Sequence, residues 1–124
     1  MLTTGQGHVV VRDWPSLEHS QTIEAHSSGA FCLELDPRGS SLAVGGSDAV
    51  VSIWDTDDWF CQKTLRSMET PIRSLSYSFD GAYICAGSDE PGGVNIDIVC
   101  AVTRCPKIKS IWLTFFFPGP LRYW

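Results

Sequence analysis

A repeat with a period of 42 residues constrains the fold of this 124-residue chain more than any other feature of its sequence. Residues 9–13, Val-Val-Val-Arg-Asp, recur as residues 51–55, Val-Ser-Ile-Trp-Asp. The same offset relates Leu33 to Leu75, Gly39 to Gly81, Leu42 to Ile84 and Gly45 to Gly87. Because one offset holds from residue 9 to residue 90, the chain consists of repeated units, and such units fold by stacking on their neighbours.

Each unit has the pattern of short β-strands separated by turns. In the complete unit, strand-like segments are expected at 31–35, 41–45, 50–54 and 60–65, where β-branched and aromatic residues are frequent. The first two are separated by Asp-Pro-Arg-Gly at 36–39, in which proline sets φ and glycine tolerates a positive φ. The pattern therefore predicts an all-β fold with four strands per period.

Four short strands per period, with Trp54-Asp55 ending the third, resemble the blades of WD-repeat β-propellers. The resemblance implies a partial WD-repeat propeller, in which one complete four-stranded blade lies between parts of two neighbouring blades. The expected blade parts are 1–26, 27–67 and 68–98, followed by a non-propeller tail at 99–124 that we predict to be irregular. The strands expected in the outer parts are 9–12 and 20–24, and then 72–77, 83–87 and 94–98. The WD-type repeat ends are Asp13, Trp54 and Asp55.

The same resemblance implies a hydrogen-bonded structural network in the complete blade, formed by His26, Asp48 and Trp54. A buried imidazole and a buried indole N–H both need hydrogen-bond partners, and a turn aspartate supplies one. Val44 stands where this family commonly has serine or threonine, so we expect the network to be incomplete. The competing interpretation is that His26 and Asp48 form a catalytic or metal-binding pair. The sequence has no third ligand or nucleophile at a useful spacing, which argues against that interpretation.

No other segment has the pattern of a catalytic or cofactor-binding site. The glycine pairs at 45–46 and 92–93 do not precede a helix and a lysine, so they are not phosphate-binding loops. Asp55, Asp57 and Asp58 form an acidic cluster without EF-hand spacing, which predicts a solvated turn rather than a calcium site. We therefore predict a non-catalytic protein with no cofactor, no metal and no small-molecule substrate.

The charge distribution favours a protein partner over a nucleic acid. All fourteen acidic residues, but only five of the nine lysines and arginines, lie in residues 1–99. Such an acidic body repels a phosphate backbone, so we expect no direct nucleic-acid binding by it. Trp14, Trp59 and Tyr83 are candidate exposed anchors for a partner, although single aromatic residues in a sheet protein more often contribute to packing.

Cysteine usage and hydropathy predict an intracellular protein without a membrane span. The chain has five cysteines, an odd number, and no pair with CxxC spacing. Cys32 and Cys85 lie within strand-like runs, which is typical of reduced structural thiols. The first residues lack the basic and apolar regions of a secretory signal. The apolar run at 111–117 contains Thr114 and is far shorter than the roughly 20 residues of a membrane-spanning helix.

Several segments resemble one group within the WD-repeat family. Residues 47–55, 71–81 and 83–90, together with 2–7 and 25–28, are similar to the WD-repeat subunits of the THO complex, above all to the fungal ones. The resemblance covers roughly residues 2–98. It implies a nuclear protein-interaction scaffold in mRNP assembly and mRNA export, with other THO subunits and mRNA export factors as partners. The alternative is a generic WD-repeat adaptor of another intracellular complex, of chromatin or ubiquitin-ligase type.

The resemblance stops near Ile98, and the following residues differ in composition. Residues 100–124 carry four basic and no acidic side chains. This tail is either a peptide that binds a partner or a membrane surface, or out-of-family sequence such as a translated intron, which its start in mid-blade favours. A closed propeller of this family has about seven blades and needs roughly 300 residues. We therefore expect the chain to be a fragment with two uncovered sheet edges.

We predict that this chain alone is marginally folded or self-associates, because uncovered blade faces and unpaired strand edges favour association. Size-exclusion chromatography with light scattering, combined with thermal melting, tests this prediction. A monodisperse monomer with a sharp and reversible melting transition would contradict it.

Overall fold

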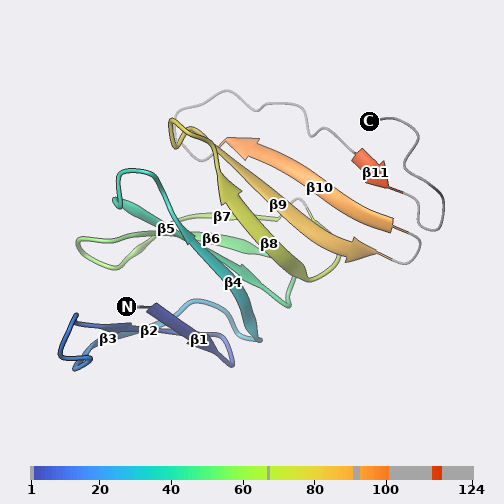
Figure 1. The fold of residues 1–124 in the computed structure, drawn as a ribbon. Coiled ribbons are helices and arrows are strands. Elements are labelled where there is room, and N and C mark those ends of the chain that lie inside the picture. The colour runs from blue at the N-terminus through green and yellow to red at the C-terminus, as the bar shows by residue number, and fades with distance from the viewer. Residues whose placement is uncertain (1, 67, 91–92, 101–112, 116–124) are drawn as a thin grey trace.

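A computed structural model describes residues 2–66, 68–90, 93–100 and 113–115, which form eleven strands in three antiparallel sheets (Figure 1). The first sheet contains β1 (Leu2–Gly5), β2 (His8–Arg12) and β3 (His19–Glu24). The second contains β4 (Ala30–Leu35), β5 (Ser41–Gly46), β6 (Val51–Asp55) and β7 (Cys61–Leu65). The third contains β8 (Ile72–Tyr77), β9 (Tyr83–Glu90), β10 (Gly93–Cys100) and β11 (Leu113–Phe115). The all-β prediction is confirmed.

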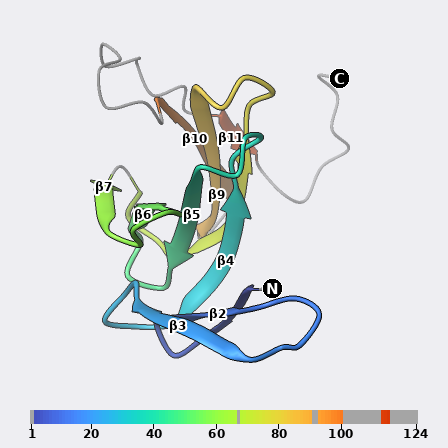
Figure 2. The same ribbon diagram turned by 90° about the vertical axis from the view of Figure 1, so that its left-hand side faces the viewer.

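The second sheet lies between the other two, as successive blades do in a propeller (Figures 1 and 2). Its contact with the first sheet is an apolar cluster of Val9, Ile23, Ala30, Leu42 and Val44. Its contact with the third sheet is a larger cluster of Ala43, Val51, Ile53, Leu65, Met68, Ile72, Ile84 and Ala86. The core of the described chain therefore lies between the blades, and the predicted partial propeller is confirmed.

β5 shows why a blade of this kind needs a neighbour on each side. Successive side chains of a strand point to opposite faces. Leu42 and Val44 accordingly pack in the cluster shared with the first sheet, whereas Ala43 packs in the cluster shared with the third. All three residues are 0% exposed. A strand that is buried on both faces has an uninterrupted apolar sequence, and residues 42–46 are Leu-Ala-Val-Gly-Gly.

The 42-residue repeat reappears in the turns. In the second sheet the Gly39 N–H donates to the carbonyl of Asp36, and in the third the Gly81 N–H donates to the carbonyl of Ser78, both at 2.9 Å. The two glycines have φ of +72° and +74°, which a residue with a Cβ adopts at a cost. A Cβ on Gly81 would lie 3.4 Å from the Pro37 ring, so the two turns lie side by side.

The structure differs from the sequence-based expectations at both ends of the propeller. Sequence reasoning missed β1, which pairs with β2 from Leu2↔Val11 to Gly5↔His8. Four residues that include two threonines and a glycine form too short a run to be recognised from sequence. β9 and β10 are longer than the predicted segments 83–87 and 94–98.

The predicted irregular tail is described only in part. Val99 and Cys100 belong to β10, and β11 pairs with β10 through Ile96↔Leu113 and Val94↔Phe115. The rest of the tail, 101–112 and 116–124, lies outside the described residues. The three-part division at residues 26, 67 and 98 stays a prediction.

The inter-sheet core predicts a large difference between two leucines that pair across β4 and β5. Leu42 is fully buried, whereas its cross-strand partner Leu35 is 45% exposed. We expect Leu42→Ala to lower the free energy of unfolding by about 2–5 kcal/mol, because it removes buried methyl groups and leaves a cavity. Leu35→Ala is the matched control, with an expected loss of under about 1 kcal/mol. Urea denaturation followed by circular dichroism measures both, in a stabilising osmolyte such as TMAO so that a marginally folded chain retains a folded baseline. Equal losses would contradict the described core.

Candidate functional site

His26 lies in the segment that links the first sheet to the second. The backbone N–H groups of Ala25 and His26 both donate to the carbonyl of Gly7, each at 3.0 Å. Gly7 has a φ of +86°, and a Cβ there would collide with the carbonyl oxygens of His26 and Ser28. A glycine in the β1–β2 turn thus lets the link pass close enough to be held by hydrogen bonds.

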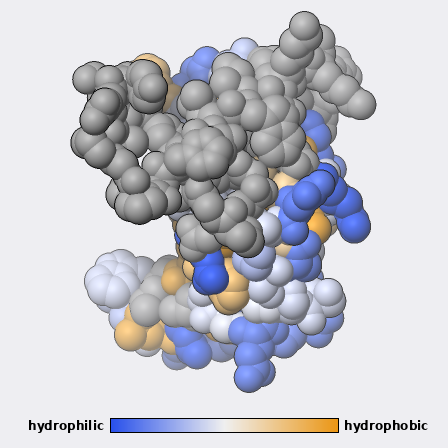
Figure 3. All heavy atoms as spheres, turned by 90° about the vertical axis from the view of Figure 1, so that its right-hand side faces the viewer, coloured by the Kyte–Doolittle hydropathy of each residue, from blue (hydrophilic) through white to orange (hydrophobic). Residues whose placement is uncertain are grey.

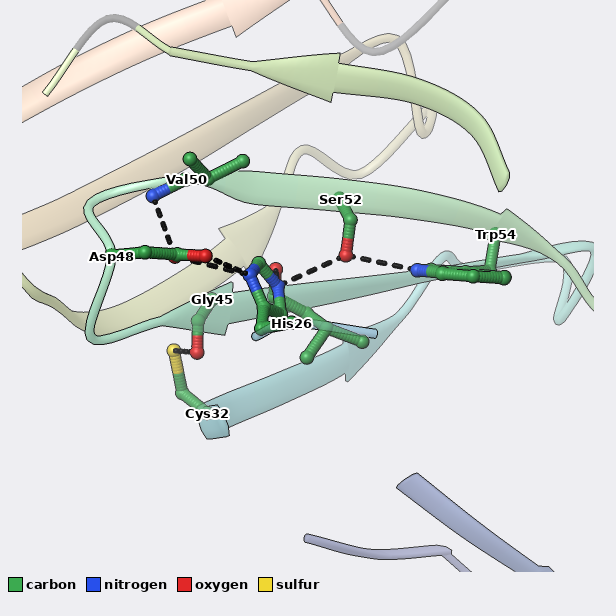
Figure 4. A network of polar contacts seen from close by, with 8 residues as sticks. His26, Cys32, Gly45, Asp48, Val50, Ser52 and Trp54 are labelled. Atoms are coloured by element: carbon green, nitrogen blue, oxygen red, sulfur yellow. Dashed lines mark hydrogen bonds and ion pairs between the residues drawn. The ribbon is translucent and has the colours of Figure 1, made fainter. Parts of the chain in front are cut away.

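The His26 ring is buried and contacts polar groups through both of its nitrogens (Figure 4). Nδ1 lies 3.0 and 3.1 Å from the two carboxylate oxygens of Asp48. Nε2 lies 3.0 Å from the hydroxyl of Ser52 and 3.1 Å from the carbonyl of Val44. The Trp54 indole N–H donates to the same Ser52 hydroxyl at 2.9 Å. The structure therefore brings His26, Asp48 and Trp54 together, with Ser52 between the ring nitrogen and the indole.

Ser52 corrects the expectation that the network is incomplete. The expected hydroxyl was that of a serine or threonine in place of Val44, but Val44 and Ser52 are cross-strand partners in β5 and β6. Directly opposed residues of an antiparallel pair project to the same face. The hydroxyl is therefore supplied from the adjacent strand. Its signal in the sequence was a serine two residues before Trp54, on the same face of the same strand.

Gly46 and the Asp48 turn leave no spare room around the imidazole. A Cβ on Gly46 would lie 2.6 Å from Nδ1 of His26. Asp48 also accepts a hydrogen bond from the Val50 N–H at 3.2 Å, which fixes the carboxylate within its own turn. This network, which we call the His26 network (His26, Asp48, Ser52 and Trp54), joins the β3–β4 link, the β5–β6 turn and β6. Its geometry is suited to holding adjacent elements together.

Asp13 and Asp55, the other marked repeat residues, form equivalent turns 42 residues apart. The Asp13 N–H donates to the carbonyl of Glu18 at 3.0 Å, and the Asp55 N–H donates to the carbonyl of Phe60 at 3.0 Å. The Asp55 carboxylate also accepts the N–H groups of Asp57 and Asp58, at 2.8 and 3.0 Å. These bonds make the acidic cluster a hydrogen-bonded turn. Within the described ranges, no group of three or more potential metal ligands is found.

The turns that contain Asp13 and Asp55 lie at one end of the sheets, which Figure 2 views directly. We call this end the Phe60 rim and define it as the turns 13–18, 36–40, 56–60 and 78–82 with the strand ends beside them. A groove of about 730 Å³ lies in it between the second and third sheets. Its lining residues are Asp36, Arg38, Ser40, Ser41, Phe60, Gln62, Tyr77, Asp80, Gly81 and Ala82. His26 and Asp48 lie in the β3–β4 link and the β5–β6 turn, at the opposite end of these strands. Figure 3 shows the molecule from that side.

The three aromatic residues singled out in the sequence have different surroundings. Trp14, on the Phe60 rim, is largely exposed. Trp59 is partly buried and packs against the cluster between the first and second sheets. Tyr83 is also partly buried. Trp14 is therefore the one of these three with the exposure of an anchor. In the part of the chain that the structure describes, no helix has the length and hydropathy needed to cross a membrane.

The repeat, the stacked sheets and the Trp-Asp end at residues 54–55 agree with the result of family comparison. The model of the WD domain, G-beta repeat family matches residues 17–55 and 59–90. This chain belongs to the WD-repeat family. The family is one of repeat scaffolds that mediate protein interactions, and no enzyme family is indicated.

Several individual proteins are similar to this chain over part of their length. The chain is 42% identical to THO complex subunit 3 of Arabidopsis thaliana over 89 residues, which are 72% of this chain and 28% of that protein. It is 43% identical to the WD repeat-containing protein AAC3 of Dictyostelium discoideum over 64 residues, 52% of this chain and 13% of that protein. Protein HIR1 of Cryptococcus neoformans is 31% identical over 97 residues, 73% of this chain and 11% of that protein.

The chain spans less than a third of the length of each of these relatives. The resemblance to THO subunits that the sequence suggested is confirmed by the Arabidopsis match. The greater similarity to the fungal forms stays a prediction.

The His26 network predicts that Ser52 is important for stability. Ser52→Ala removes the acceptor of the Trp54 N–H and a partner of the His26 ring, so we expect the free energy of unfolding to fall by about 1–3 kcal/mol. Ser40→Ala is the matched control, because that hydroxyl is exposed and donates to Asp36. Its expected effect is within about 0.5 kcal/mol. Urea denaturation at equal protein concentration compares the two, and a loss at Ser52 no larger than that at Ser40 would refute the role of the network.

Proposed function

We propose that this chain is a non-catalytic scaffold that binds other subunits of a THO-type complex in mRNP assembly and nuclear mRNA export. The observation that carries the proposal is the 42% identity with THO complex subunit 3 over 72% of the chain. The AAC3 match has similar identity but covers 52% of the chain, and the HIR1 match has similar coverage at 31% identity. The THO match thus combines the identity of the one with the coverage of the other.

The described residues support a scaffold role in physical terms. In the His26 network, the ring nitrogens, the serine hydroxyl and the indole N–H are all engaged in hydrogen bonds between strands and turns. His26 and Ser52 are buried, so a substrate on the surface does not reach them. The acidic body suits a protein partner better than RNA.

A chromatin-type adaptor is the second candidate function, because the chromatin assembly factor 1 subunit FAS2 homolog of Oryza sativa is 32% identical to this chain over 80 residues. In either role the protein would act in the nucleus. A subunit I of eukaryotic translation initiation factor 3 from Candida albicans is 29% identical over 76 residues, so a cytoplasmic complex is an outcome that the test must distinguish.

Affinity purification of the tagged full chain from nuclear extract of its own source cells tests the proposal. We expect THO subunits to be recovered with the chain. The control is Leu42→Ala at matched expression, which removes a fully buried side chain between the first two sheets and should abolish recovery.

The possible outcomes are distinct. Absence of THO subunits, despite good expression of soluble tagged chain, would overturn the proposal. Recovery of chromatin assembly factor subunits in their place would support the chromatin adaptor. Exclusion of the chain from the nucleus would contradict both.

A further inference from the structure

Exposed apolar side chains gather on the Phe60 rim. Among the described residues, five of the six large hydrophobic side chains that are exposed lie there: Trp14, Leu17, Leu35, Phe60 and Phe79. The sixth, Phe31, is the second residue of β4, at the opposite end, and the guanidinium carbon of Arg73 lies 4.8 Å from the centroid of its ring. Single exposed apolar residues are normal on a protein surface, whereas a gathering at one end of three sheets indicates a contact surface.

Phe79 is the most exposed of these residues, at 100%. It stands 42 residues after Pro37, at the second position of the same turn. The turn is held by Asp80, whose carboxylate accepts hydrogen bonds from the Ser78 hydroxyl at 2.6 Å and from the Ala82 N–H at 3.0 Å. The same hydrogen bonds lower the pKa of Asp80, with the Ser78 bond contributing most. An aromatic ring is thus presented to solvent on a turn with its own hydrogen bonds, next to a carboxylate that is charged at neutral pH.

The groove beside this turn combines apolar surface with hydrogen-bonding groups. The Phe60 ring lines it from the second sheet, and Tyr77 lines it from the third. The Tyr77 hydroxyl is buried and has no hydrogen-bond partner within the described residues. Burial, the largest cause, and the nearby carboxylates of Asp36 and Glu34 raise the pKa of this phenol, so the hydroxyl keeps its proton. Because this hydroxyl is buried, Tyr77 offers its ring and not its hydroxyl to a molecule in the groove.

The Phe60 rim is also acidic. Its four turns contain six carboxylates and one guanidinium: Asp13, Glu18, Asp36, Asp57, Asp58 and Asp80, against Arg38. The Asp57 and Asp58 side chains are exposed and stand just before Phe60. A surface with apolar anchors among carboxylates is complementary to a segment that carries cations beside an apolar side chain.

We propose that the Phe60 rim binds a segment of a partner protein in which arginine or lysine neighbours a large apolar side chain. The apolar side chain packs in the groove against Phe60, Phe79 contacts the segment from the adjacent turn, and the cation lies against the rim carboxylates. RNA is disfavoured because the rim repels phosphate. A second copy of the chain meeting rim to rim is disfavoured because two acidic surfaces would face each other. The inference rests on the proposed scaffold function and assigns the Phe60 rim as the surface that binds the partner.

Site-specific photocrosslinking in the full chain tests the assignment. Benzoylphenylalanine in place of Phe79 probes the rim, and the same replacement of Phe31 is the matched control at the opposite end. Irradiation in nuclear extract, followed by mass spectrometry of the joined peptides, identifies the segment in contact. We expect position 79 to crosslink to another protein, within a segment that has arginine or lysine next to an apolar residue, and position 31 not to crosslink to that segment.

A charge reversal gives the second measurement. Asp57→Arg with Asp58→Arg reverses rim charge but keeps the turn, because only the N–H groups of these residues bond to Asp55. We expect crosslinking from position 79 to fall about tenfold, since close charge pairs at an interface contribute strongly to affinity. Glu24→Arg with Glu69→Arg makes the same change of net charge outside the rim and should leave crosslinking unchanged.

Each result decides between the alternatives. Crosslinks from position 79 to RNA, to a second copy of the chain or to an acidic segment would overturn the assignment, as would equal effects of the two charge reversals. Recovery of THO subunits without crosslinking at position 79 would support the proposed function and contradict the Phe60 rim as the binding surface. Crosslinking to a basic, apolar segment of a protein outside the THO complex would support the rim as a binding surface and contradict the THO function.

Discussion

The burial of both faces of the second sheet is the constraint on which the rest of the structure depends. Leu42 and Val44 on one face of β5, and Ala43 on the other, are removed from water only because a neighbouring sheet covers each face. Buried apolar surface contributes about 25 cal/mol per Å², so the two apolar clusters between the sheets stabilise the fold. Stability in such an architecture is approximately a sum over units and their interfaces, so no blade is independent of the next.

The His26 network supplies hydrogen-bond partners for polar groups that the stacking of the sheets buries. The link from the first sheet to the second passes close to the turn of the neighbouring hairpin, where buried polar groups need partners. His26 meets this need on both sides of its ring, and Ser52 supplies from β6 the hydroxyl that Val44 in β5 lacks. Val44 is thereby free to pack in the cluster between the first two sheets. The hydroxyl of the network thus comes from β6, and the apolar side chain opposite it comes from β5.

Much of the fold could be predicted from the sequence, because the repeated residues are those that form turns and pack strands. Turn glycines, the alternating strand at 31–35 and the Trp-Asp end at 54–55 predicted the second blade, and its four strands lie where they were expected. β1 was missed, since a run of four residues with little apolar content acquires its strand only by pairing with β2. Ser52 was missed for a related reason. Its role depends on the strand opposite, and a pattern read along one strand does not show which residue across the sheet fills the same place.

The buried strands and the His26 network hold the sheets together, whereas the Phe60 rim is the exposed surface that we propose for binding. Hydrogen exchange of the chain, read residue by residue, tests this most directly, because exchange reports local opening free energies. We expect the amides of β5 and β6 to exchange most slowly and those of the rim turns 36–40 and 56–60 to exchange faster. Amides of β5 that exchange as fast as those of the turn at 36–40 would contradict a second sheet held from both sides.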